Sequence, residues 1–137
     1  MVKLVAGGMG TGKSRRLIEM ANASVKTTDG SIVFIDYDNR HMYALHYDVR
    51  FIETRDFPLD NHREFLGFIC GIMSRDSDIK EIYVDDLNRI IKMLDDEHKV
   101  TLCDRLAELG DKYGLDFILA FNRDPAGLPD GLKQLII

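Results

Sequence analysis

The sequence predicts an α/β fold with three layers, α/β/α, in which helices cover both faces of a mostly parallel sheet of about five strands. Short apolar runs alternate with stretches of helical periodicity, as in a chain built from β-α-β units. The run over residues 31–36 is apolar without polar alternation, which is typical of a strand buried on both faces. Because 137 residues suffice for one core, we expect a single domain over residues 1–137.

The first half of the chain is predicted to contain three strands and two helices. Leu17, Ile18 and Ala21 fall on one helical face, and apolar residues over 65–73 recur at intervals of three and four. Positions 37–47 show no clear period, so no element is predicted there. The predicted elements are a strand over 2–6, a helix over 13–23, strands over 31–36 and 49–52, and a helix from a cap at Asp60 or Asn61 to about Ser74.

The second half continues the alternation with two more strands. A strand is predicted over 81–85, and a helical stretch follows it that is broken or bent near Asp95 and Asp96. The helix continues over 97–113, where Gly114 ends it, and a fifth strand is predicted over 115–121. The tail over 125–137 is predicted to form a short closing strand or a docked terminal turn.

The charge and hydropathy of the chain exclude several classes of protein. Eighteen Lys and Arg against 23 Asp and Glu give a net charge of −5, so nucleic acid is not an expected partner. No apolar run approaches the roughly 20 residues that cross a bilayer, and the N-terminal apolar run is too short for a signal peptide. We therefore expect a cytoplasmic protein without a membrane span.

The cysteines and histidines show no metal-binding pattern. Cys70 and Cys103 stand in unrelated segments without a CxxC pair, so we expect both to be reduced and buried. The histidines share no ligand spacing and are interpreted as surface or cap residues: His41, His46, His62 and His98.

A glycine-rich segment between the first predicted strand and helix matches GxxxxGK[ST] in full. It consists of Gly7, Gly8, Met9, Gly10, Thr11, Gly12, Lys13 and Ser14. The glycines let backbone N–H groups turn toward a phosphate, and the helix N-terminus adds partial positive charge. Lys13 is predicted to reach the β- and γ-phosphates, and Ser14 to ligate Mg²⁺. A plain glycine-rich turn does not account for a lysine in the first helical turn, where cations are disfavoured.

Residues beyond this loop are predicted to complete the nucleotide site. Arg15 and Arg16 follow directly, and one of them, assigned to Arg15, is predicted to reach a phosphate or the adenine. The strand over 81–85 ends in Asp85 and Asp86, as in a Walker B segment. Asp85 is the predicted Mg²⁺ ligand, and Asp86 is predicted to orient or deprotonate the attacking nucleophile. The alternative is that Asp86 is a solvated cap of the following helix.

The phosphate loop and the Asp85 strand resemble those of P-loop NTPases, in particular the RecA-like division with an additional strand. The resemblance implies a strand between the phosphate-loop strand and the Walker B strand, with a polar γ-phosphate sensor at its end. Asn122 follows the fifth predicted strand and fills that position. Arg123 is next, either as a phosphate contact, in cis or in a neighbouring subunit, or as a solvated residue.

Two narrower resemblances concern the same loop. It is similar to the GxMxSGK[ST] loop of bacterial thymidine kinases, in which a catalytic Glu follows the Walker B Asp, where this chain has the shorter Asp86. The zinc-binding CxxC pair and the substrate-covering lasso of those kinases are absent from these residues. The chain also looks like small bacterial ATP-binding proteins that are sometimes labelled as pilus-retraction ATPases.

The sequence therefore predicts Mg²⁺-dependent binding of ATP or another NTP, with hydrolysis, by one P-loop nucleotide-binding domain. The alternatives are a kinase for a small nucleoside-type substrate and a non-hydrolysing ATP-binding regulatory module. A homo-oligomer or a protein partner that completes the site is a further possibility of the same resemblance.

The loop after the second strand offers further candidates. Asp36 and Asp38 are alternative bases or caps, and the segment 36–40 is expected near the ligand because it leaves the carboxyl end of a parallel strand. Tyr37, Tyr43 and Tyr47 are candidates for stacking on a base or for filling the core.

Overall fold

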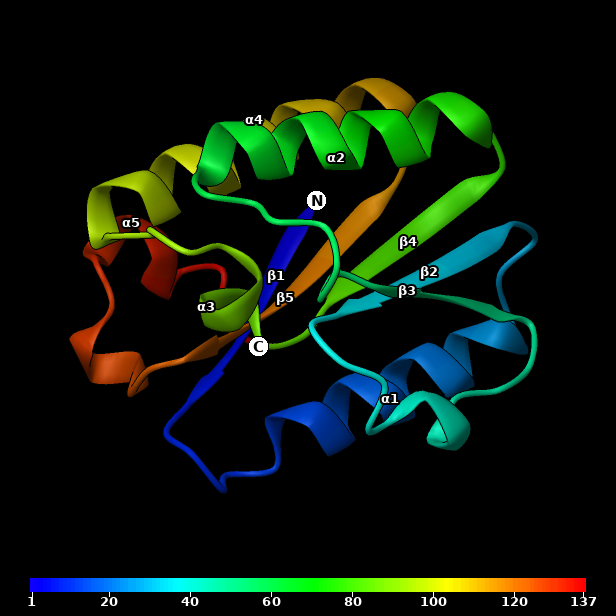
Figure 1. Cartoon of the computed structure of the whole chain (residues 1–137), viewed down its shortest axis with the longest axis horizontal. Coiled ribbons are helices and arrows are strands. Elements are labelled where there is room, and N and C mark those ends of the chain that lie inside the picture. Colours follow the sequence, from blue (N-terminus) through cyan, green and yellow to red (C-terminus); the bar gives the residue numbers. More distant parts are fainter.

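A sheet of five strands forms the centre of the fold, in the spatial order β1-β5-β4-β2-β3 (Figure 1). The computed structural model describes residues 1–137, and every pairing in the sheet is parallel. The strands are β1 (Val2–Gly7), β2 (Ser31–Asp36), β3 (Val49–Glu53), β4 (Ile79–Val84) and β5 (Asp116–Asn122). The helices are α1 (Lys13–Val25), α2 (His62–Arg75), α3 (Leu87–Ile90), α4 (Asp96–Tyr113) and α5 (Asp130–Lys133), with short 3₁₀ turns η1 (Met42–Ala44) and η2 (Pro125–Gly127).

Helices cover both faces of the sheet, so the predicted α/β class and its layers are confirmed. Figure 1 shows α1 on one face and α2 with α4 on the other. A cluster of 22 buried residues joins α2 and α4 to the sheet, and a second cluster of 10 joins α1 to the opposite face. In β2, Val33 and Ile35 belong to the first cluster and Ile32 and Phe34 to the second. Burial on both faces is the reason for the continuous apolar run.

The predicted start of α2 and the predicted end of α4 are confirmed. The Asn61 side chain accepts a hydrogen bond from the Glu64 backbone N–H at 3.0 Å, and Glu64 accepts one from the Asp60 N–H at 2.7 Å. Asn61 is therefore the cap of α2, in a reciprocal capping arrangement. Gly114 has a φ of 70° and ends α4, as predicted.

The helical stretch after β4 is interrupted more widely than the sequence indicates. One helical turn, α3, is followed by an extended segment in which Lys92 N–H donates to the Leu59 carbonyl and Met93 N–H to the Asp60 carbonyl. These bonds to the segment before α2 replace helical bonds, so α4 begins only after the cap at Asp95.

The tail docks beside β1 through a short helix and one isolated bridge. Leu4 N–H donates to the Leu135 carbonyl and Ile137 N–H donates to the Leu4 carbonyl, both at 2.9 Å. Ile136 forms a parallel bridge to Leu4, so the tail has features of both predicted alternatives.

The expectation that both cysteines are buried is wrong for one of them. Both thiols are free, and Cys103 is buried, but Cys70 is exposed on α2. The neighbouring Ile69 takes the core-facing position at 0% exposure, and one step along a helix turns the next side chain by about 100°.

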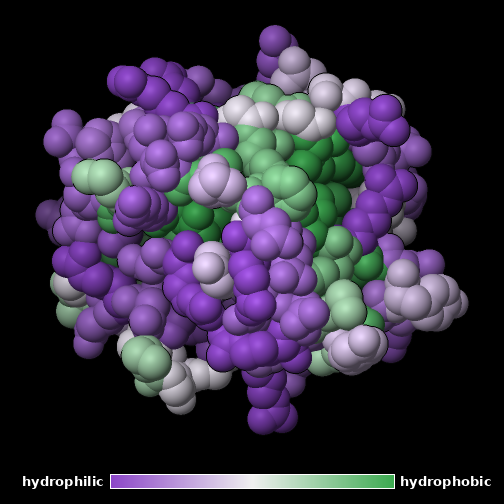
Figure 2. All heavy atoms as spheres, in the orientation of Figure 1, coloured by the Kyte–Doolittle hydropathy of each residue, from purple (hydrophilic) through white to green (hydrophobic).

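Hydrophobic groups also reach the surface beside the sheet edge. Figure 2, drawn in the orientation of Figure 1, shows hydrophobic residues gathered near the middle of the view, with hydrophilic residues around them. A hollow of about 580 Å³ between β3 and α2 is lined by apolar side chains that include Phe51, Ile52, Phe68 and Ile72. No helix combines the length and the apolar character needed to cross a membrane.

The buried face of α2 provides a test of the core. Phe65 is 0% exposed, whereas Phe57 is 59% exposed in the loop before α2. We expect Phe65→Ala to lower the free energy of unfolding by about 3–5 kcal/mol, because it leaves a cavity between α2 and the sheet. Denaturant titration followed by circular dichroism measures this. Phe57→Ala is the control, with an expected change within about 0.5 kcal/mol, and equal effects of the two changes would contradict the packing described here.

Candidate functional site

The carboxyl ends of the parallel strands meet at one edge of the sheet, and a cavity of about 450 Å³ lies there. Its walls come from the loop after β1 with the start of α1, the loop after β2, the segment after β4 with α3, and the end of β5 itself. Seven of the residues predicted from the sequence line this cavity: Met9, Gly10, Lys13, Ser14, Asp85, Asp86 and Asn122. The parallel topology therefore brings the glycine-rich loop, the Asp85 strand end and the Asn122 strand end together, as the sequence predicts.

The loop between β1 and α1 depends on its glycines. Gly10 and Gly12 have φ values of 76° and 84°, in the left-handed region that favours glycine. A Cβ atom on Gly7 would lie 2.4 Å from the Thr11 hydroxyl, which donates a hydrogen bond to the Gly8 carbonyl at 2.8 Å. The loop is therefore tightly folded on itself.

The N-terminus of α1 is electrostatically unlike those of the other long helices. The first N–H groups of an α-helix have no acceptor within the helix, and side chains usually supply one. Asn61 caps α2 and Asp95 caps α4, each with acidic residues in the first turn. At α1 the cap is Gly12, no side chain accepts a hydrogen bond there, and the first turn has no acidic residue. An anion at this end would satisfy the free N–H groups and offset the charge of Lys13.

Lys13 joins the loop to the neighbouring strand. Its Nζ atom donates to the Gly8 carbonyl at 2.7 Å and to Asn122 Oδ1 at 3.3 Å. Gly7 and Asn122 are register partners in the pairing of β1 with β5, which explains why the amide lies beside the loop. The amide predicted as a γ-phosphate sensor is thus in contact with the predicted phosphate-binding lysine.

Asp85 and Asp86 differ in burial and in backbone conformation. Asp85 is 4% exposed, and its Oδ1 accepts the Asp86 N–H at 2.8 Å. Asp86 is the only non-glycine residue with positive φ, at 58°, a conformation that costs free energy. Burial raises the pKa of Asp86, against the attraction of Arg89. Asp86 occupies the N-cap position of α3, where its backbone carbonyl accepts the Ile90 N–H at 3.1 Å, but its side chain makes no cap hydrogen bond there.

Ser14 and Asp85 are the residues that could hold a magnesium ion whose other ligands were phosphate and water. Both line the cavity, so a hydroxyl and a carboxylate face the same space. No group of three or more His, Cys, Asp or Glu side chains could hold a metal. Magnesium is commonly bound in this way, through one or two protein oxygens together with substrate phosphates, rather than in a protein cage.

Asp36 and Asp38 are both buried at the end of β2 but have different partners. Asp36 Oδ1 accepts the Tyr37 N–H at 2.7 Å, whereas Oδ2 has no hydrogen-bond partner. Burial, followed by repulsion from Asp85, raises the pKa of Asp36 to about 7. Asp38 accepts hydrogen bonds from Arg40 and Arg89, so it is held as a paired carboxylate. Of these two alternative bases, only Asp36 keeps a free oxygen.

Three further arginines of the predicted set lie outside the cavity. Arg15 pairs with Glu19 at 3.0 Å on the exposed surface of α1, and Arg16 donates to the Ile137 carbonyl at 2.9 Å. Arg123 forms an ion pair with Asp96. It also donates to the Gly127 carbonyl at 2.7 Å and does not line the cavity, while 38% of its side chain stays exposed to solvent.

The three tyrosines after β2 differ in how far they are exposed. Tyr37 is partly buried, with the Arg89 guanidinium 4.2 Å from its ring centroid. Tyr43 and Tyr47 are 91% and 88% exposed, so they do not fill the core.

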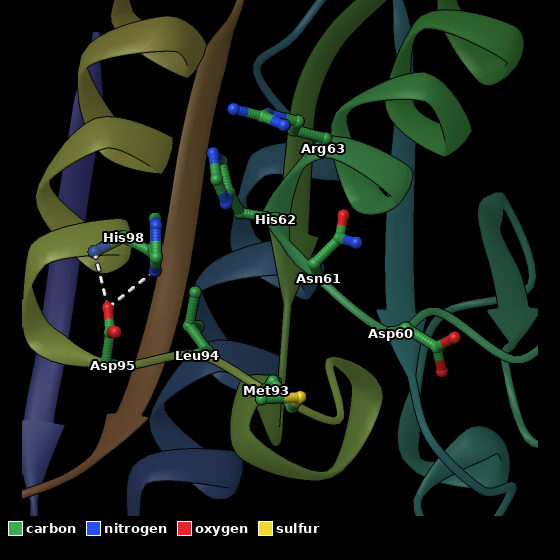
Figure 3. Close-up of a pocket in the computed structure, with 8 residues that line it drawn as sticks. All are labelled: Asp60, Asn61, His62, Arg63, Met93, Leu94, Asp95 and His98. Atoms are coloured by element: carbon green, nitrogen blue, oxygen red, sulfur yellow. Dashed lines mark hydrogen bonds and ion pairs between the residues drawn. The ribbon is translucent and has the colours of Figure 1, made fainter.

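A larger cavity of about 650 Å³ lies elsewhere, between the starts of α2 and α4 (Figure 3). His62 and His98 stack there with ring centroids 4.7 Å apart, and His98 Nδ1 lies 2.7 Å from Asp95 Oδ1. The interpretation of His62 as a surface or cap residue is wrong, because it is only 8% exposed. Burial, followed by the charge of His98, lowers the pKa of His62. None of the predicted site residues lines this cavity.

Sequence reasoning missed part of the cavity wall. The lining residues that were not predicted are His41, Asn88, Arg89 and Ala120, whereas Arg40 belongs to the segment 36–40 expected near the ligand. Arg89 is one helical turn after Asp86. No local pattern marks Arg89, because only the packing of α3 beside the sheet brings it to the cavity.

Comparison with known proteins does not assign a family. No protein-family profile matches this chain, and no curated protein sequence matches it.

The burial of Asp36 predicts a pH-dependent stability. Its pKa lies near 7 in the folded protein and near 4 in the unfolded chain, so folding favours the protonated form. The stabilising effect is complete below pH 4 and is lost as the pH rises to about 7. Asparagine does not ionise, so Asp36→Asn should exceed the wild type in free energy of unfolding by roughly 2–4 kcal/mol at pH 8 and match it near pH 4.

Urea titrations of both proteins at the two pH values, in the presence of a chelator, measure this difference. Asp130→Asn, at an exposed position, is the control. A difference between Asp36→Asn and the wild type that stays constant with pH would contradict the burial of a titrating carboxyl at this position.

Proposed function

We propose that this chain is a P-loop NTPase of the RecA-like division that binds Mg²⁺-ATP, or another Mg²⁺-NTP, and hydrolyses it. The observation that carries the proposal is the uncapped N-terminus of α1, which joins a GxxxxGKS loop at a cavity that Asp85 also lines. A triphosphate supplies the anion that this helix end lacks, and its magnesium supplies the cation that the buried carboxylate lacks.

The strand order supports the RecA-like assignment. β5 lies between β1, which carries the phosphate loop, and β4, which carries Asp85. This is the arrangement implied by the resemblance to the additional-strand division. Asn122, at the end of β5, contacts Lys13 and is the proposed γ-phosphate sensor.

Each residue has one role in the proposed reaction. Lys13 stabilises charge on the transferring phosphoryl group, and Ser14 and Asp85 hold Mg²⁺. Asp86 orients or deprotonates the attacking water, and its raised pKa suits a group that accepts a proton.

The main test is calorimetry with ATP and GTP in Mg²⁺ and in chelator, together with a phosphate-release assay on the same sample. Binding without release would favour the regulatory module or a kinase that lacks its acceptor.

Replacing Lys13 should abolish nucleotide binding. The Lys13→Ala variant loses the only phosphate-loop ammonium while the glycine conformations remain, so we expect affinity for Mg²⁺-ATP to fall by roughly 100-fold or more with the fold intact. Calorimetry measures the affinity, and circular dichroism checks the fold. Lys26→Ala, at the opposite end of α1, is the matched control. Unchanged affinity in Lys13→Ala would rule out the phosphate-loop assignment.

Replacing Asp86 should separate binding from turnover. Asparagine keeps the shape and tolerates positive φ, but it does not accept a proton, so Asp86→Asn should bind Mg²⁺-ATP normally and release phosphate roughly 100-fold more slowly. Phosphate release at saturating ATP measures this, with Asp60→Asn as a control at an exposed position outside the cavity. If Asp86→Asn turns over at the wild-type rate, the base lies elsewhere, and Asp36 is the next residue to test.

A further inference from the structure

Three arginines surround one buried carboxylate at the edge of the proposed nucleotide site. Asp38 is 3% exposed, and its Oδ1 accepts a hydrogen bond from Arg40 Nε at 3.0 Å. Its Oδ2 accepts one from Arg89 Nη1 at 3.1 Å and lies 3.8 Å from Arg55 Nη2. A single carboxylate thus orients guanidinium groups that come from separate parts of the chain.

Two of these three arginines share the cavity with the phosphate loop. Arg40 and Arg89 line the same cavity as Lys13 and Ser14, whereas Arg55 does not. Both also approach the Asp86 carboxylate, Arg89 at 3.4 Å and Arg40 at 4.0 Å. Since Asp86 is the residue proposed to orient the nucleophile, the two guanidinium groups lie on the side of the cavity where the terminal phosphate would be attacked.

The guanidinium groups are held in place but keep free donors. Arg89 packs over the Tyr37 ring, 4.2 Å from its centroid, and uses only Nη1 for its two carboxylate partners. The guanidinium group of Arg40 donates a hydrogen bond only from Nε, and the side chain is 63% exposed. The remaining N–H groups of both residues are available to phosphate oxygens, which guanidinium forks bind well.

We propose that Arg40 and Arg89, positioned by Asp38, form a cationic clamp for the terminal phosphate of a nucleoside triphosphate. The clamp distinguishes a triphosphate from a diphosphate, because the phosphate loop contacts both nucleotides while the clamp reaches only the third phosphate. This inference rests on the proposed function and assigns the role of phosphate-contacting arginine within that site. Arg123, the arginine that the sequence suggests for this role, is held by Asp96 outside the cavity.

The test compares two nucleotides in matched variants of the full chain. Calorimetry measures the affinities for Mg²⁺-ADP and for the Mg²⁺ complex of the non-hydrolysable β,γ-imido analogue of ATP. We expect the wild type to bind the analogue more tightly than ADP. In Arg40→Gln and Arg89→Gln the ratio of the two affinities should fall roughly 10-fold or more, while affinity for ADP changes less than about threefold.

Arg55→Gln is the matched control, because Arg55 faces the same carboxylate but lies outside the cavity, and its affinity ratio should equal that of the wild type. Arg89→Lys keeps the positive charge near Asp38 and should give an intermediate ratio. If thermal unfolding shows that Arg89→Gln does not fold, Arg40→Gln and Arg89→Lys decide the question.

The two proposals fail in different ways. If the wild type binds both nucleotides and the ratio is unchanged in the clamp variants, the clamp is overturned and the nucleotide site stands. An equal loss in Arg55→Gln would also overturn it, because the effect would then belong to the charge around Asp38. If the wild type binds neither nucleotide, the proposed function fails and the clamp fails with it.

Discussion

The parallel pairing of β1, β5, β4 and β2 is the constraint on which the candidate site depends. A strand of six residues spans roughly 20 Å, so reversing any one of these strands would carry its terminal side chains to the opposite edge of the sheet. With all strands parallel, Lys13, Asp86 and Asn122 lie around one cavity although they are far apart in the sequence. The apolar layers on both faces hold this arrangement, because they bury β2 and β4 from two sides.

Electrostatic balance at the end of β2 is reached in two different ways. Asp38 is buried as a charged group, and the guanidinium groups of Arg40 and Arg89 offset its desolvation. Asp36 has no cation within hydrogen-bond distance, and its raised pKa lets it hold a proton near neutral pH. Protonation of Asp36 removes part of the repulsion between Asp36 and Asp85. The same segment therefore provides a paired carboxylate that anchors arginines and a buried carboxyl whose pKa lies near neutrality.

The phosphate loop satisfies some of its own polar groups. The Gly8 carbonyl accepts hydrogen bonds from both Thr11 and Lys13, so the lysine is held within the loop rather than extended into solvent. A phosphate that binds must draw Lys13 Nζ away from the carbonyl of Gly8 or share it. No side chain caps the N–H groups at the start of α1, so these groups remain available to an anion.

Some elements of the structure could be predicted from the sequence, and others could not. The glycine-rich turn between β1 and α1 and the buried strand β2 were predictable, because loop conformation and burial follow from neighbouring residues, such as the glycines with positive φ. The full interruption between α3 and α4 could not be predicted, because it depends on hydrogen bonds from the backbone N–H groups of Lys92 and Met93 to the segment before α2. Burial of His62 escaped prediction for a similar reason, since it requires the stacking of His98 from another helix.

The sequence by itself determined the α/β class, the alternation of strands and helices, and the glycine conformations of the first loop. These are local properties, because hydrophobic period and glycine conformation act over a few residues. The tertiary structure alone decided which charged groups meet. Asp38 and Arg89 are separated by 51 positions and contact only because β2 and β4 are neighbours in the sheet. Arg123 follows a strand just as Arg40 does, but Asp96 of α4 holds it away from the cavity. Arginine side chains are long and reach carboxylates of distant segments, so their roles follow from packing rather than from spacing along the chain.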